Sequence, residues 1–113
     1  MASSPADRLQ LIYEAYKAAF ARRGTDLKQA QTADEAQAVL DNVDSLERSY
    51  LDAARQALDA NGDTIEAAYQ AAKAASDAVE RAYQQGQQLA ARINAVAGVA
   101  SAVSNLLTKA ADA

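Results

Sequence analysis

The chain has 113 residues, half of them hydrophobic, which is enough for one small domain with a modest core. Its 11 basic and 15 acidic residues give a net charge of −4, which argues against nucleic acid as a partner because phosphate binding needs a basic stripe. The absence of cysteine and histidine excludes disulfides, thiol nucleophiles, histidine general bases and most zinc sites. We therefore expect a non-enzymatic protein that uses no cofactor or metal.

The first predicted helix covers residues 5–23, after a disordered stretch at 1–4. Ser4-Pro5 is typical of a helix start, because serine caps the helix and proline suits its first position, and Asp7 stabilises the positive end. Gly24 follows two arginines, which is a common signal for the end of a helix. The apolar face of this helix consists of Leu9, Ile12, Tyr13, Tyr16, Ala19 and Phe20.

The second predicted helix covers residues 33–60. The preceding segment, 24–32, fits either a loop or an additional turn of helix, because no residue in it forbids helix. Thr32 and Glu35 have the spacing of a capping box, which marks a helix start. Gly62 marks the end of the segment and is expected to adopt a backbone conformation that favours glycine. The apolar seam consists of Ala36, Val39, Val43, Leu46, Tyr50, Ala53, Ala57 and Ala60.

The third predicted helix covers residues 64–110, because apolar residues or glycine recur there at alternating steps of three and four. Gly86 could divide this helix and produce a fourth, but the seam keeps its phase across the glycine, which favours one continuous helix. The short connection at Gly62 predicts an antiparallel hairpin of the second and third helices. The acidic residues between 34 and 47 would then either pair with Arg81 across the hairpin or face solvent.

These elements predict one all-α domain over residues 1–113, built as an antiparallel helical hairpin or a three-helix bundle with a long C-terminal helix. That helix extends beyond the reach of the second, and its segment 93–108 carries no charge. Ile93 and Leu107 are expected to be buried, and aliphatic side chains on this face to contact a protein partner or a second copy. The predicted interface consists of Leu89, Ile93, Val96, Val99, Val103, Leu106 and Leu107.

The leading functional hypothesis is an interaction or structural protein that binds through this C-terminal seam. The first alternative is a protein that associates with a membrane or granule surface through residues 93–108, a segment too short and too polar to span a bilayer. In composition, the Ala/Gln-rich amphipathic helices resemble phasin-like granule coats. The second alternative is a small secreted protein, since the helical hairpin resembles WXG-type secreted proteins of bacteria, although the chain has no tryptophan. The N-terminus lacks the pattern of a signal peptide, which favours the cytoplasm and leaves signal-less secretion open.

Overall fold

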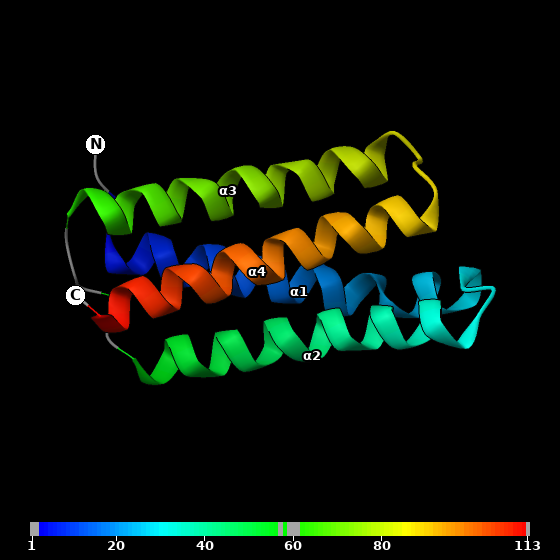
Figure 1. Cartoon of the computed structure of the whole chain (residues 1–113), viewed down its shortest axis with the longest axis horizontal. Helices are drawn as coiled ribbons and strands as arrows, with labels where there is room; N and C mark the ends of the chain where they lie inside the picture. Colours follow the sequence, from blue (N-terminus) through cyan, green and yellow to red (C-terminus); the bar gives the residue numbers. More distant parts are fainter. Residues whose placement is uncertain (1–2, 57, 59–61, 113) are drawn as a thin grey trace.

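A computed structural model describes residues 3–56, 58 and 62–112. This part of the chain forms a bundle of helices that measures 43 × 26 × 18 Å (Figure 1). The predicted all-α helical bundle is confirmed, but the number of helices differs from the prediction, because the described residues form four. These helices are α1 (Pro5–Gln29), α2 (Ala33–Arg55), α3 (Asp63–Gln84) and α4 (Leu89–Asp112).

The bundle consists of two antiparallel hairpins, α1–α2 and α3–α4, packed side by side. α2 packs closely against α4, and α1 approaches α3 at fewer places. In the described structure α2 and α3 are not neighbours, and Figure 1 shows them at opposite edges of the bundle. The predicted hairpin of these two segments is therefore wrong.

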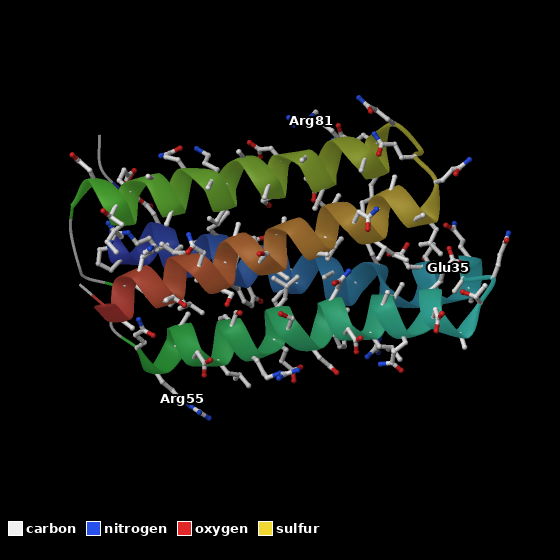
Figure 2. The ribbon with its side chains drawn as sticks, in the orientation of Figure 1. Glu35, Arg55 and Arg81 are labelled. Carbon is white, nitrogen blue, oxygen red and sulfur yellow. The ribbon has the colours of Figure 1, made fainter. Side chains whose placement is uncertain are left out.

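The charge pairing predicted for that hairpin is also wrong. Figure 2 shows Arg81 pointing away from the bundle on the side of α3 that lies far from α2. Glu35 and Arg55 mark the two ends of α2 at the opposite edge of the molecule. The acidic residues of α2 at positions 34, 41, 44 and 47 thus lie away from Arg81, and their side chains are exposed to solvent.

The start of α1 matches the prediction, but its end does not. Ser4 accepts a hydrogen bond from the backbone N–H of Asp7, and the Asp7 carboxylate accepts one from the Ser4 N–H, which completes a capping box. α1 then continues through Gly24 to Gln29. A glycine inside a helix lowers helix stability by only about 1 kcal/mol relative to alanine. The helix continues past Gly24 because Asp26, in the next turn, is buried against α3 and α4.

A glycine does end α3, at the position where the sequence favoured a continuous helix. Gly86 has a φ of +63°. Its N–H donates to the carbonyl of Tyr83, and the Gln87 N–H donates to the carbonyl of Ala82, which is the Schellman pattern of a helix C-terminus. The seam keeps its phase because the turn happens to preserve the spacing between Ala82 and Leu89, so apolar periodicity alone could not reveal this reversal.

The connection between α2 and α3 begins earlier than predicted, because α2 ends at Arg55 rather than at residue 60. Ala57, Ala60 and Asn61 lie outside the described residues. Gly62 is the N-cap of α3 and has a φ of +134°, a conformation that only glycine adopts easily. The predicted glycine-favoured conformation of Gly62 is confirmed.

The core lies between the two hairpins and receives apolar side chains from all four helices. Among the described residues, the most deeply buried apolar side chains are Ile12, Leu46, Ala72, Val103 and Leu106. Most of the other core positions are alanine and valine, as the alanine-rich seams predict. Side chains this small let the helices approach closely only where both partners offer a matching surface.

Candidate functional site

Most of the predicted interface residues lie in the core of the single chain. Val103 and Leu106 are fully buried, Val96, Val99, Leu89 and Leu107 are buried, and Ile93 is only half-buried. The prediction for Leu107 is therefore confirmed and the one for Ile93 is wrong. These side chains are covered by α1, α2 and α3, because the reversal at Gly86 folds α4 back along the bundle. Their apolar character is satisfied without a second molecule.

A different surface carries a group of aromatic side chains, of which Phe20 is exposed and the three tyrosines are half-buried. It lies on the outer face of the α1–α2 hairpin, and we call it the aromatic surface. Its rings belong to Tyr13, Tyr16 and Phe20 of α1 and to Tyr50 of α2. The ring centroids of Tyr13 and Tyr50 lie 5.2 Å apart, those of Tyr16 and Tyr50 5.9 Å, and those of Tyr16 and Phe20 6.0 Å. Four of the chain's six aromatic residues thus form one continuous cluster.

Large apolar side chains beside these rings are open to solvent. Phe20 is 46% exposed, Leu51 44% and Leu40 36%, and these three are the exposed large hydrophobic residues among the described part of the chain. Leu40 and Leu51 lie seven residues before and four residues after Glu47, so they share its face of α2. Since Glu47 contacts Tyr16, both leucines border the aromatic surface. Exposed apolar side chains that are grouped on one face often mark an interaction site.

Charged side chains frame the aromatic surface with opposite signs on its two helices. On α1, the Lys17 ammonium lies 5.8 Å from the Tyr13 ring centroid and the Arg23 guanidinium 4.5 Å from that of Phe20. On α2, the Tyr16 hydroxyl donates a 3.1 Å hydrogen bond to Glu47. Burial, this hydrogen bond and the charge of Glu47 raise the pKa of Tyr16 above its ordinary value. The tyrosine therefore stays neutral and acts as a hydrogen-bond donor.

From the sequence, these aromatic residues were expected to belong to the core, because they recur at the same helical spacing as the other apolar residues. Tyr13, Tyr16 and Phe20 occupy the edge of the α1 stripe rather than its centre, which is held by Ile12, Ala15 and Ala19. The available signal was the width of the apolar stripe on α1. It is wider than one neighbouring helix can cover.

Buried polar groups form a cluster where α1, α3 and α4 meet. The Tyr83 hydroxyl donates a 2.5 Å hydrogen bond to Asp26, and Nη1 of Arg92 lies 3.3 Å from the same carboxylate. Arg92 also donates to the side chain of Gln29. Burial and the negatively charged Asp26 raise the pKa of Tyr83, which is the opposite of what an activated tyrosine base or nucleophile needs. We interpret this cluster as a clamp between helices.

A second polar cluster joins the start of α1 to α3. The backbone N–H and the hydroxyl of Ser3 both donate to the Glu66 carboxylate, at distances down to 2.8 Å. The buried Arg8 donates to the hydroxyl and the carbonyl of Ser3 and, over 2.7 Å, to the carbonyl of Leu58. Ser3, which was expected to be disordered, is therefore held in place, while residues 1 and 2 lie outside the described part.

Within the described residues there is no group of three or more acidic, histidine or cysteine side chains that could hold a metal ion. One segment of the described chain, Leu89–Ala111, is long and apolar enough to cross a membrane by length and composition alone. Its most apolar stretch has a mean hydropathy of 1.2, and 33% of that stretch is buried in the bundle. Leu89–Ala111 is longer than the segment 93–108, which is too short to span a bilayer, but core helices of soluble bundles meet the same two criteria.

In comparisons with known proteins, no family model, no curated protein and no solved structure matches this chain.

Proposed function

We propose that this chain is a non-enzymatic interaction protein whose helical bundle associates with a second copy of itself through the aromatic surface. The observation that carries the proposal is the position of Phe20, Leu40 and Leu51. All three large exposed apolar side chains of the described structure lie on the same α1–α2 face as the aromatic cluster. Burying them in an interface is favourable by about 25 cal/mol per Å² of apolar area.

Aromatic side chains are suited to this role. They bury large areas with few rotatable bonds and are enriched among the residues that dominate interface energies. The contacts among Tyr13, Tyr16 and Tyr50 also hold the rings in place before association, so little side-chain freedom is lost on binding.

The charges around the aromatic surface support a second copy as the partner. Lys17 lies on the α1 side, and Asp44 lies on the α2 side, three residues before Glu47 and on the same helix face. In a twofold dimer, a patch on one copy meets the same patch on the other. If α1 of one copy faces α2 of the other, Lys17 approaches Asp44 of the second copy twice, once on each side of the axis.

Sedimentation equilibrium tests the proposal with Phe20→Glu and the matched control Ala74→Glu. The control introduces the same charge on the exposed part of α3. We expect the wild type and Ala74→Glu to sediment as dimers and Phe20→Glu as a monomer, because a carboxylate in a buried apolar interface is costly. A monomeric wild type, or a Phe20→Glu variant with the mass of the wild type, would contradict the proposal.

Charge reversal tests the orientation of the two copies. Lys17→Glu alone places two carboxylates at each predicted contact, and Asp44→Lys alone places two ammonium groups there, so both variants should dimerise more weakly than the wild type. A heterodimer of the two variants has opposite charges at both contacts, because the native Lys17–Asp44 pair is kept at one contact and the charges are exchanged at the other. We expect heterodimers in the mixture at concentrations where each variant alone is monomeric. A mixture that remains monomeric would exclude this orientation.

A second candidate function is association with a membrane through α4. The observation in its favour is the length and composition of the segment Leu89–Ala111. Its aliphatic face is buried in the bundle, so binding would require the α3–α4 hairpin to open away from α1–α2. Flotation with vesicles of neutral and anionic lipids tests this function, and protein that stays at the bottom of the gradient with both compositions would exclude it.

A further inference from the structure

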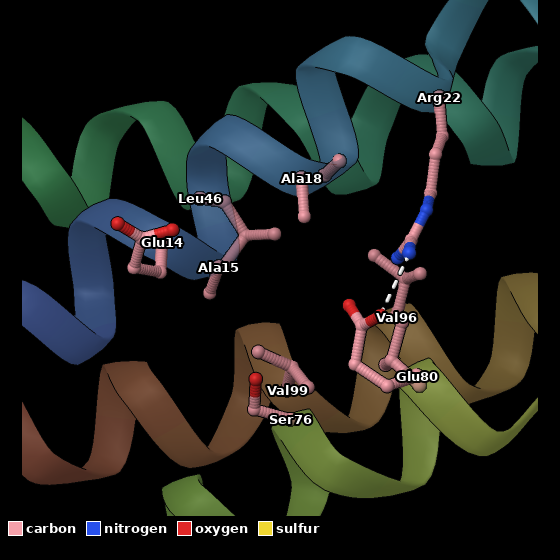
Figure 3. A pocket seen from close by; sticks show the side chains of 11 residues that line it. Glu14, Ala15, Ala18, Arg22, Leu46, Ser76, Glu80, Val96 and Val99 are labelled. Atoms are coloured by element: carbon pink, nitrogen blue, oxygen red, sulfur yellow. Dashed lines mark hydrogen bonds and ion pairs between the residues drawn. The ribbon is translucent and has the colours of Figure 1, made fainter.

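The other flank of α1, which faces α3, contains a cavity of about 230 Å³. Figure 3 shows Ala15 and Ala18 of α1 on one side of it and Ser76 of α3 on the other, with Val96 and Val99 of α4 also lining the space. The remaining lining residues are Glu14, Ala19, Arg22, Leu46, Val79 and Glu80. The cavity is therefore formed by all four helices and lies apart from the aromatic surface.

The cavity exists because α1 presents alanine where α3 cannot reach it. Ala15 and Ala18 have side chains of one carbon, too short to fill the space toward Ser76 and Val79. At one end of the cavity the helices are held at this separation by the Arg22–Glu80 ion pair, whose atoms lie 2.9 Å apart. The space is partly open to solvent, so an apolar ligand that enters it displaces water from apolar walls, which is favourable.

Its volume suits a small aromatic molecule. An engineered apolar cavity of about 150 Å³ binds benzene, so 230 Å³ accommodates one ring with a short side chain. The walls near the middle are apolar, with Leu46 and Val99 buried. A ring there would contact aliphatic side chains from three helices.

The charges at the rim favour a cation. The lining contains two carboxylates, Glu14 and Glu80, and one guanidinium, Arg22. Arg22 is already matched by Glu80 and lies 4.0 Å from the ring centroid of Tyr83. Its Nη1 atom is buried and has no hydrogen-bond partner in the described structure, whereas Nη2 is paired with Glu80. This leaves the Glu14 carboxylate, which accepts a hydrogen bond from Gln10, as the uncompensated charge.

We propose that this cavity binds a small aromatic amine, with the ring between Ala18 and Val99 and the ammonium group beside Glu14. A neutral ring of the same size fills the apolar part but provides no cationic partner for the Glu14 carboxylate. A carboxylate ligand of the same length places a second negative charge beside Glu14, since Glu80 is already paired with Arg22. Binding is independent of the self-association proposed above, because the two sites occupy different flanks of α1.

Calorimetric titration with phenethylammonium and with 3-phenylpropanoate tests the charge preference, since the two probes share a ring and differ in the sign of the head group. We expect saturable binding of the amine and binding of the carboxylate that is at least about fivefold weaker, the ratio that corresponds to one exposed ion pair. The absence of saturable amine binding at millimolar concentration, or equal affinity for both probes, would overturn the proposal.

Two variants locate the binding site. Ala18→Leu extends a side chain into the cavity, and we expect amine binding to weaken by more than about tenfold, with a higher melting temperature than the wild type. The control Ala74→Leu adds the same atoms on the exposed part of α3 and should leave binding unchanged. Glu14 is exposed, so the Glu14→Gln variant should fold even if Ala18→Leu disturbs the packing of the bundle. In Glu14→Gln we expect the ratio of amine affinity to carboxylate affinity to fall to about one. Wild-type affinity in Ala18→Leu, or wild-type preference in Glu14→Gln, would refute the assignment.

Discussion

α2 and α4 pack closely through apolar side chains, whereas α1 and α3, the other pair of parallel neighbours, meet at fewer places and leave a cavity between them. The α1–α3 side is instead joined by the polar cluster around Glu66 at one end and by the Asp26 cluster toward the other. The difference arises from side-chain size, because α1 offers Ala15 and Ala18 where α2 offers Val43 and Leu46. The same bundle geometry therefore yields a closed interface on one side and a potential binding site on the other.

Removal of the Asp26 carboxylate should have the largest effect on this comparison. Asp26→Ala leaves the buried Arg92 without its ion-pair partner and the Tyr83 hydroxyl without its acceptor, which we expect to lower the free energy of unfolding by about 3 kcal/mol. Asp41→Ala, on the exposed face of α2, is the control and should change stability by less than about 0.5 kcal/mol. Urea denaturation measures both. Equal stability of the two variants would mean that polar contacts do not hold the α1–α3 side together.

Replacing a valine by alanine should lower the free energy of unfolding more in the packed core than beside the cavity. Val103→Ala creates a new cavity in the fully packed core, with an expected loss of about 2–3 kcal/mol. Val79→Ala only enlarges a space that already exists, so we expect a loss of about 1 kcal/mol. Urea midpoints of the two variants provide the measurement. A larger loss for Val79→Ala would show that the α1–α3 side is as tightly packed as the rest.

Replacing Gly24 or Gly86 by alanine should change the stability of the protein in opposite directions. Gly24 lies within α1, and nothing lies within 4 Å of the position that an alanine methyl group would occupy there, so Gly24→Ala should raise stability by about 0.5–1 kcal/mol. It would also strengthen the part of α1 that carries Asp26. Gly86→Ala places a side chain at a φ of +63° and should lower stability by about 1–2 kcal/mol. Thermal melts of both variants check the signs, and a stabilising Gly86→Ala would contradict the α3–α4 turn.

The smallest expected effect concerns pH and the Glu66 cluster. Hydrogen bonds from the Ser3 backbone N–H, the Gln70 amide and the Ser3 hydroxyl lower the pKa of Glu66. A carboxyl group whose pKa is lower in the folded state stabilises the fold above its unfolded pKa, and this contribution is lost as the pH falls through the folded value. The wild type should therefore lose more stability between pH 7 and pH 3 than Glu66→Gln, as urea denaturation at the two pH values would measure. Asp77→Asn, which removes a second acid of α3, serves as the control and should lose as much as the wild type.

Local sequence signals predicted the parts of the fold that depend on neighbouring residues. The capping box at Ser4, the cap at Thr32 and the glycine conformation at Gly62 all follow from groups within a few positions along the chain. The signals failed where a distant contact outweighed the local preference. Gly24 has the local signature of a helix end, but the burial of Asp26 against Tyr83 and Arg92 extends α1 past it.

The candidate surface illustrates the same limit. Periodicity identified apolar positions on both helices, among them Tyr13, Tyr16 and Phe20 on α1 and Val103 and Leu106 on α4. It predicted that the α4 positions would be left uncovered within one chain, whereas in the structure these are buried and Phe20 of α1 is exposed. Which stripe is covered depends on whether the chain reverses at Gly86. That reversal leaves the phase of the seam unchanged, so the pattern of apolar residues is the same with and without it.

The sequence by itself determined that this protein is an all-α bundle with alanine-rich seams, because helix propensity and apolar spacing are properties of short segments. Only the tertiary structure decided that two hairpins lie side by side, that α4 is enclosed and that α1 carries an aromatic surface on one flank and a cavity on the other. The physical reason is that burial is a property of pairs of helices. An apolar stripe requires a partner but does not specify which one.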